Sequence, residues 1–220
     1  MFTKTQTLLI LISIIKLLLI KVVLSDEKCT NGNRLIQTVK ISNNLASNIT
    51  KIHNYYRLKV SQGEVWQQPQ GRNLFRLYYD HQLARSARKA SLNCDMKMVD
   101  ITDPRWYNVG QNMYLEYSNV PTPTQNWDAV IAAWFEEHHH YSFPDDKTKY
   151  ITVSRATAHY TQLVWAKSRN VGCDFVVFYE YDRKGTPYGK LYTCFYGPGG
   201  NVLGEKPYEV GTSPDCLQLC

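Results

Sequence analysis

The side chain best placed for chemistry is a histidine in the C-terminal third of the chain. His159 opens the run HYTQLVW at 159–165, so it stands directly ahead of a tight aromatic and aliphatic cluster. Burial beside such a cluster can hold an imidazole in place, and a held imidazole can serve as a catalytic group or a metal ligand. We therefore take His159 as the centre of a candidate site.

Three consecutive histidines at 138–140 could be considered as metal ligands, since His140 lies one helical turn from Glu136. Consecutive residues of a helix point in different directions, however. We therefore interpret this run as a solvated helix end with His138 turned inward, and we expect no metal there.

Nucleophilic catalysis has little support in the sequence. Acyl transfer requires a serine or cysteine that a base activates, and the chain contains no G-x-S-x-G motif. Its six cysteines are an even number, and in a secreted chain we expect them to form three disulfides. The sequence therefore predicts no catalytic residue.

One disulfide follows from the local sequence. Residues 173–181 and 188–194 are aromatic and β-branched runs on either side of a turn, which predicts a β-hairpin. The hairpin places Cys173 opposite Cys194, within the separation that a disulfide requires. Two arrangements remain open for the other four: Cys216 and Cys220 pair with each other, or separately with Cys29 and Cys94.

The ends of the chain indicate secretion. Residues 1–25 have the short polar start, apolar centre and small-residue end of a secretory signal peptide. Lys16 and Lys21 interrupt the apolar run, so stable membrane insertion is not expected. We predict one domain at 45–208, preceded by an N-terminal extension at 26–44 and followed by a cysteine-containing tail at 209–220.

Two further properties bear on partners. Asn48 begins the only N-x-[ST] sequon, so it is a predicted glycosylation site. Without the three lysines of residues 1–25, 22 basic and 19 acidic residues leave a net charge of +3. This net charge is small, and the sequence contains no basic run with interleaved aromatics, so we do not expect a nucleic-acid partner.

Hydrophobic spacing predicts the helices that position these residues. Apolar side chains recur at helical intervals in 45–60, in 80–94 and most strongly in 126–138. We expect Asn126 to cap the third of these helices and Thr157 to cap a short helix across His159. Helices come first and the strand pair follows, so the chain is predicted to be a layered α+β domain.

Four motifs give the chain a family resemblance. In chain order they are His53-Asn-Tyr-Tyr-Arg57, Gly110-Gln-Asn-Met113, the run at 159–165, and YTCFYGPGGNV at 192–202. They resemble the landmarks of the CAP superfamily, which includes cysteine-rich secretory proteins, antigen 5 venom allergens and plant pathogenesis-related proteins. The resemblance covers residues 45–208 and implies a three-layer α-β-α sandwich. The overall pattern is most similar to the venom allergen-like proteins of parasitic worms.

The resemblance also implies a central cavity in which two histidines and two acids meet and sometimes bind a metal. His159 and Glu137 match that pattern, but Gln111 and Met98 stand where the family has glutamate and histidine. Catalytic zinc normally has three protein ligands, and an amide and a thioether are poor replacements. We therefore expect Glu137, His159 and Gln111 to form a polar network without metal, cofactor or catalysis. Metal binding by the surviving pair is the less favoured alternative.

Aromatic side chains near the middle of the chain form a second candidate site. Residues 113–127 are predicted to be a loop, because Pro121 and Pro123 exclude helix and central strand there. Exposed apolar patches commonly mark binding sites. By resemblance to the loop through which some CAP proteins bind sterols, we assign four residues to a sterol site: Tyr114, Tyr117, Val120 and Trp127. The alternative is that they cover the core.

A fatty-acid groove is a further possibility between the helices predicted at 45–60 and 126–138. Some CAP proteins hold a fatty acid or eicosanoid between two helices. That resemblance assigns six residues to the groove: Ile49, Ile52, Tyr56, Val130, Ala133 and Trp134. Ordinary core packing is the favoured alternative for them.

These observations predict a secreted, non-enzymatic protein that binds or exports sterols or fatty acids. The main rival is an immunomodulatory scaffold that presents its loops to a host extracellular protein. A metal-dependent hydrolase is a third class, which Met98 and Gln111 disfavour.

Overall fold

The computed structural model describes residues 28–145, 154–212 and 219–220. The predicted signal peptide at 1–25 and Cys216 lie outside these ranges. Within them, no helix has both the length and the apolar character needed to cross a membrane.

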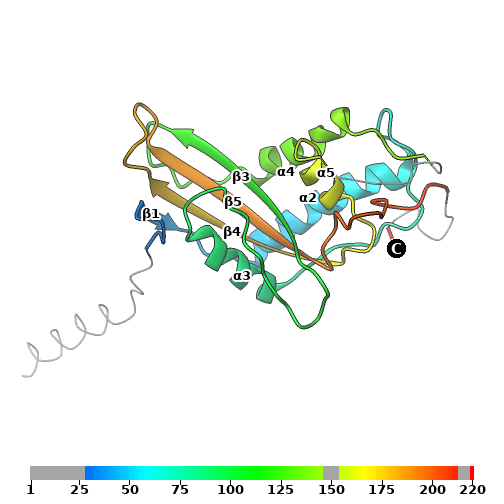
Figure 1. Cartoon of the computed structure of the whole chain (residues 1–220), viewed down its shortest axis with the longest axis horizontal. Helices are drawn as coiled ribbons and strands as arrows, with labels where there is room; N and C mark the ends of the chain where they lie inside the picture. Colours follow the sequence, from blue (N-terminus) through cyan, green and yellow to red (C-terminus); the bar gives the residue numbers. More distant parts are fainter. Residues whose placement is uncertain (1–27, 146–153, 213–218) are drawn as a thin grey trace, which may run out of the picture.

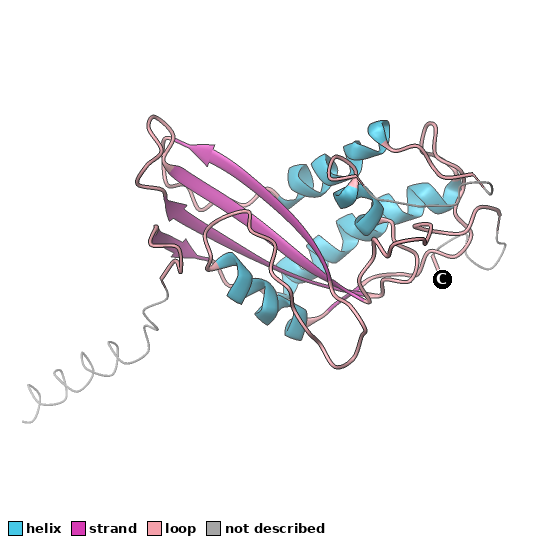
Figure 2. Cartoon of the chain, viewed as in Figure 1, coloured by secondary structure: helices cyan, strands magenta, loops and turns pink. Residues whose placement is uncertain are grey.

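A long hairpin forms the centre of the sheet (Figure 2). Its strands, β4 (Asn170–Tyr179) and β5 (Tyr188–Gly197), pair antiparallel over their whole length. Most of their residues are buried on both faces, so the strands are near-continuous apolar and aromatic runs in the sequence. The predicted hairpin is therefore confirmed.

Three shorter pairings complete the sheet. β3 (Gly110–Ser118) pairs antiparallel with β5. β1 (Arg34–Thr38) and the two-residue β2 (Tyr78–Tyr79) pair with opposite ends of β4, antiparallel and parallel respectively. Residues 34–38, which we assigned to the N-terminal extension, are thus part of the sheet.

Helices cover both faces of this sheet (Figure 1). On one face α3 (His81–Ser91) packs over β4 and β5. The other face carries α2 (Asn43–Gln62), α4 (Trp127–Glu136) and α5 (Ala158–Leu163). A 3-10 turn, η1 (Glu137–His140), continues α4. The protein is therefore the three-layer α+β sandwich that the sequence predicts.

Capping side chains set where most of the helices begin. Ser42, Asp80 and Asn126 each accept a hydrogen bond from a backbone N–H of the first turn that would otherwise lack a partner. Thr157 occupies the N-cap position of α5 but makes no such bond. The predicted position of Thr157 is therefore correct, but the prediction that its side chain caps the helix is wrong. Another residue supplies the hydrogen-bond acceptor.

Two disulfides join pairs of described residues. Cys173 and Cys194 are directly paired residues of β4 and β5 and are bonded, as predicted. Cys29 is bonded to Cys94, which decides one of the pairings that the sequence left open. Cys220 is also disulfide-bonded. Such bonds indicate folding in an oxidising compartment.

The expectation of a loop at 113–127 is wrong for its first half. Residues 113–118 belong to β3 and pair with β5, and only the residues after Ser118 leave the sheet. Pro121 and Pro123 restrict only their immediate surroundings, so they gave no information about the aromatic and aliphatic residues before them, which suit a strand.

Candidate functional site

Glu137 and His159 form a close pair, as the sequence predicts. Glu137 Oε1 lies 2.6 Å from His159 Nδ1, and Glu137 Oε2 accepts the backbone N–H groups of His159 and Tyr160. Those N–H groups belong to the first turn of α5, which has no intrahelical partner for them. The Glu137 carboxylate therefore caps α5 from another element, where its negative charge also complements the helix dipole.

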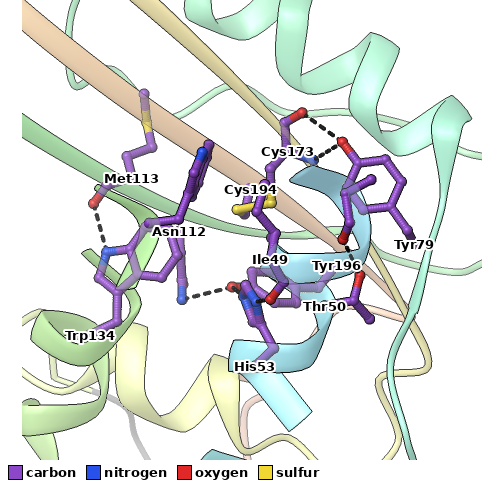
Figure 3. Close-up of a disulfide and its surroundings, with 12 residues drawn as sticks. Ile49, Thr50, His53, Tyr79, Asn112, Met113, Trp134, Cys173, Cys194 and Tyr196 are labelled. Carbon is purple, nitrogen blue, oxygen red and sulfur yellow. Dashed lines mark hydrogen bonds between the residues drawn. A yellow bond between two sulfur atoms is a disulfide. The ribbon is translucent and has the colours of Figure 1, made fainter. Parts of the chain in front are cut away.

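The ring of His159 is held on several sides. Trp134 of α4 stacks on it, with ring centroids 6.1 Å apart and planes 22° apart. The Trp134 indole donates in turn to the carbonyl of Met113 (Figure 3). The His159 backbone carbonyl accepts a hydrogen bond from the Asn112 amide. The side chains of His159 and Glu137 remain 28% and 20% exposed, so solvent reaches the pair.

This pair offers few groups for catalysis or metal binding. Both oxygens of Glu137 and the Nδ1 of His159 are engaged with each other or with the start of α5. Nε2 of His159 and one remaining lone pair of Glu137 Oε1 are the ligand positions that these hydrogen bonds leave open. A catalytic zinc site normally has three protein ligands, so the arrangement serves structure better than chemistry.

The other two predicted cavity residues lie elsewhere. Gln111 accepts a hydrogen bond from the backbone N–H of Val99, and its amide nitrogen is buried without a partner among the described residues. Met98 is 63% exposed. The predicted network of Glu137, His159 and Gln111 is therefore wrong, because successive side chains of β3 point to opposite faces. The neighbouring Asn112 is the residue that reaches His159.

Asn112 also joins a buried network that the sequence did not reveal (Figure 3). Its amide donates to the Tyr196 hydroxyl, which lies 2.9 Å from Nε2 of His53. Nδ1 of His53 lies 2.8 Å from the Ile49 carbonyl, and because a carbonyl only accepts, this nitrogen carries the proton. Tyr196 therefore donates to Nε2, and burial lowers the pKa of His53 to about 4.

The rest of the first motif also has structural roles. Asn54 exchanges two hydrogen bonds with the backbone of Leu77. Arg57 is fully buried, and its guanidinium donates to five backbone carbonyls: those of Phe75, Leu163, Trp165, Ala166 and Ser168. Burial lowers the pKa of Arg57 to about 9, which leaves it protonated at neutral pH. These residues tie α2 to the end of α5.

The two C-terminal motifs contact each other directly. Thr161 Oγ1 donates to Asn201 Oδ1 over 2.7 Å, and the backbone N–H of Gly200 donates to Gln162 Oε1 over 2.8 Å. A Cβ on Gly110 would lie 1.8 Å from that same oxygen of Gln162. A side chain at residue 110 would therefore displace the Gln162 amide from its hydrogen bond with Gly200.

The residues predicted to form a sterol site do not share a surface. Tyr114 packs against the core on the α2 side of the sheet, where its ring centroid lies 6.2 Å from that of Tyr192. Tyr117 faces the opposite side, where the Arg183 guanidinium covers its ring. Trp127 is 2% exposed, whereas Val120 is 49% exposed. Covering the core, the stated alternative, therefore describes Tyr114, Tyr117 and Trp127 better.

The fatty-acid groove predicted between α2 and α4, a seam between the two helices, is largely filled by side chains. Ile49, Val130 and Trp134 are buried in the core, as the core-packing alternative expects. The other three residues, Ile52, Tyr56 and Ala133, are half-buried. Tyr56 stacks on Phe135 of α4, with ring centroids 4.4 Å apart.

An open groove of about 610 Å³ runs along another side of α2. Its lining is mainly apolar and aromatic and includes Tyr55, Leu58, Leu77, Tyr78, Tyr79 and Leu219. Lys51 and Arg76 also contribute. The sequence gave no direct signal for this groove, because α2, β2 and the C-terminal tail all contribute to it.

Helices on both faces of a mainly antiparallel sheet, together with disulfides within the sheet and between its N-terminal segment and the residues after α3, define a disulfide-bonded α-β-α sandwich that carries one Glu–His pair. The chain belongs to the CAP family. A family model described as the cysteine-rich secretory protein family matches residues 50–196.

Individual relatives agree with this assignment. Salivary antigen-5 of Dipetalogaster maximus is 31% identical over 195 residues, which cover 85% of this chain and 74% of the relative. The crystal structure of NaASP2 with Zn²⁺ matches with a TM-score of 0.62 and 22% identity, covering 82% of this chain and 96% of the other. Schistosoma mansoni venom allergen-like protein 4 matches with a TM-score of 0.53 and 23% identity, covering 77% and 97%. The predicted resemblance is confirmed, and the two solved structures bear on the fold alone.

Proposed function

We propose that this protein is a secreted, non-enzymatic CAP protein that binds a fatty acid in the groove beside α2. The observation that carries the proposal is the composition of this groove, an apolar and aromatic lining with the cationic Lys51. Such a surface suits a molecule with a long hydrocarbon chain and one negative charge. The groove replaces the seam between α2 and α4 as the proposed location.

The size of the groove supports an acyl chain. Ligand sites in proteins commonly measure about 300–1,000 Å³, and the groove measures about 610 Å³. Each buried methylene contributes about 0.8 kcal/mol, so covering half of a sixteen-carbon tail contributes about 6 kcal/mol before ordering costs. An open groove is therefore sufficient for useful affinity.

The state of the Glu137–His159 pair supports a non-enzymatic role. Catalysis by this pair would need a nucleophile for the base to activate; Nε2 of His159 is free, but the chain contains no G-x-S-x-G motif and the described residues include no free cysteine. The relatives are named as antigens and allergens. Binding without turnover is the function that this arrangement favours.

Titration of the purified protein with palmitate tests the proposal. Saturable binding is expected, and Tyr55→Asp should weaken it about tenfold or more by placing a second charge beside the hydrocarbon. Tyr55 is 52% exposed, so this variant is expected to fold. Tyr107→Asp is the matched control, because Tyr107 is an exposed tyrosine outside the groove.

Two outcomes would contradict the proposal. One is no saturable palmitate binding by the wild-type protein. The other is equal weakening by Tyr55→Asp and Tyr107→Asp. Cholesterol is titrated in parallel. Saturable cholesterol binding that Tyr117→Ala weakens and Tyr55→Asp leaves unchanged would favour the sterol site predicted from the sequence.

A second candidate, an extracellular scaffold that binds another protein, is favoured by one exposed loop. Arg105 pairs with Asp80 and Asp103 and so holds this loop in place. Met98 and Tyr107 of the same loop are 63% and fully exposed. Saturable binding of a partner protein that Tyr107→Ala abolishes, together with no lipid binding, would support this candidate.

A further inference from the structure

The turn after α4 brings together two histidines and a carboxylate outside the Glu137–His159 pair. The chain tightens to 3-10 geometry at η1, where residues three apart align instead of residues four apart. Glu136 therefore meets His139 and not His140, and its Oε2 lies 3.1 Å from His139 Nε2. The ring of His138 lies 4.0 Å from that of His139. The predicted solvated helix end with His138 turned inward is confirmed, since His138 is buried and His139 and His140 are exposed, but the rings of His138 and His139 do not point apart.

The ligand atoms of Glu136, His138 and His139 are close enough for one ion. They all lie within 4.8 Å of one another. In a tetrahedral zinc site with bonds of about 2.0–2.1 Å, neighbouring ligand atoms are about 3.3 Å apart. The side chains of Glu136 and His139 are 60% and 48% exposed. Small rotations of these two exposed side chains would therefore close the site on His138.

His138 is the fixed member of the group. It is only 7% exposed, and its Nδ1 lies 2.9 Å from the Phe135 carbonyl. Because a carbonyl only accepts, Nδ1 carries the proton and Nε2 keeps the lone pair that binds a metal. Gln68 also donates to the backbone carbonyls of His138 and Tyr141, which anchors the turn.

We propose that Glu136, His138 and His139 form a binding site for a divalent cation of the Zn²⁺ or Cu²⁺ type. Two imidazole nitrogens and one carboxylate oxygen suit these ions, whereas Mg²⁺ and Ca²⁺ prefer oxygen ligands alone. Three protein ligands leave a further position for water or another ligand. The site does not use Glu137 or His159 and is independent of lipid binding.

Trp66 provides a natural reporter for the site. Its ring lies 6.5 Å from that of His139, and Cu²⁺ is paramagnetic and quenches the fluorescence of nearby indoles. Trp134, by contrast, stacks on His159. The two tryptophans therefore distinguish an ion at this turn from an ion at the Glu137–His159 pair.

The experiment uses the secreted chain, prepared without a histidine tag and freed of metal with a chelator. Zn²⁺ binding is measured by calorimetry and Cu²⁺ binding by tryptophan fluorescence. Saturable binding is expected, and His139→Ala should weaken it about tenfold or more. His140→Ala and His159→Ala should leave it unchanged. Trp66→Phe should bind Zn²⁺ normally but lose most of the quenching by Cu²⁺.

Three results would overturn the proposal: no saturable binding of either ion by the wild type, equal binding by wild type and His139→Ala, or loss of binding in His159→Ala alone. The last result would assign the ion to the Glu137–His159 pair. His139 is exposed, so its variant is expected to fold, and a circular dichroism spectrum identical to that of the wild type checks this.

Discussion

At the scale of single residues, burial decides which side chains can change charge. His53 is fully buried between α2 and β5. Loss of hydration lowers its pKa to about 4; the hydrogen bond with the Ile49 carbonyl opposes this decrease, and the nearby Arg57 guanidinium contributes to it. His53 is therefore neutral in the folded protein under conditions where an unfolded chain would protonate it.

Stability is predicted to fall on acidification because of His53. Between pH 6.5, the ordinary pKa, and about 4, the unfolded chain binds a proton at His53 that the folded chain does not. The free energy of unfolding therefore decreases as the pH falls through this window. The full effect is limited to about 3 kcal/mol.

Comparison with His53→Gln separates this effect from those of other groups. Burial raises the pKa of Asp174 from 3.8 to about 6. The contribution of Asp174 to the free energy of unfolding therefore decreases as the pH rises through that range, which is opposite to the effect of His53. Urea unfolding of both proteins at about pH 7 and about pH 4.5 gives their stability difference. The wild-type advantage should narrow at the lower pH, and a difference that stays constant would contradict the assignment.

At the scale of elements, the sequence predicted segments with one clear periodicity and missed those without it. The hairpin and the three long helices could be predicted because burial produces continuous or helically spaced apolar runs. β3 was missed because aromatic residues alternate between two covered faces and the following prolines favoured a loop. Without that strand, the face occupied by Gln111 could not be known.

The candidate site was predictable only as far as its local spacing. The pairing of Glu137 with His159 followed from the motifs, but the cap that Glu137 provides to α5 depends on how α4 and α5 pack. Likewise, the 3-10 geometry that joins Glu136 to His139 is a property of the folded turn. Tertiary packing rather than residue type decided both features.

Replacing Glu137 with alanine should destabilise α5. The change removes the acceptor for the N–H groups of His159 and Tyr160 and for the His159 ring. Loss of an N-cap costs about 0.5–2 kcal/mol, and unpaired buried donors add to this, so we expect a decrease of about 1–3 kcal/mol in the free energy of unfolding. Urea denaturation in the presence of a chelator measures it.

The adjacent Glu136→Ala is the matched control for this substitution. Glu136 is exposed, and its carboxylate pairs with His139 at the surface. Exposed ion pairs contribute little, so this variant should change stability by no more than about 0.5 kcal/mol. Equal losses in Glu136→Ala and Glu137→Ala would show that Glu137 has no special role at α5.

At the scale of the whole molecule, one disulfide joins the N-terminal segment to the residues that follow α3. Cys29 precedes β1, and Cys94 follows α3, so their disulfide fixes the N-terminal strand to the helical layer on that face. The backbone N–H of Thr30 also donates to the carbonyl of Leu92. The segment before residue 45 is thus held to the domain at two points, by this bond and by the pairing of β1 with β4.

Removing this disulfide should release β1 before the rest of the sheet. Its closed loop has a sequence separation of 65 residues, against 21 for Cys173–Cys194. Chain-entropy arguments give about 4 kcal/mol for the longer loop and about 3 kcal/mol for the shorter one. We expect the free energy of unfolding of Cys29→Ser/Cys94→Ser to be about 4 kcal/mol lower than that of the wild type. The amide hydrogens of residues 34–38 should exchange faster. Palmitate binding should be unchanged, since the groove lies beside α2. Hydrogen exchange measured by mass spectrometry checks this. Unchanged protection of β1 would show that pairing with β4 alone holds this strand. Protection lost equally across β5 would show that the domain unfolds as one unit.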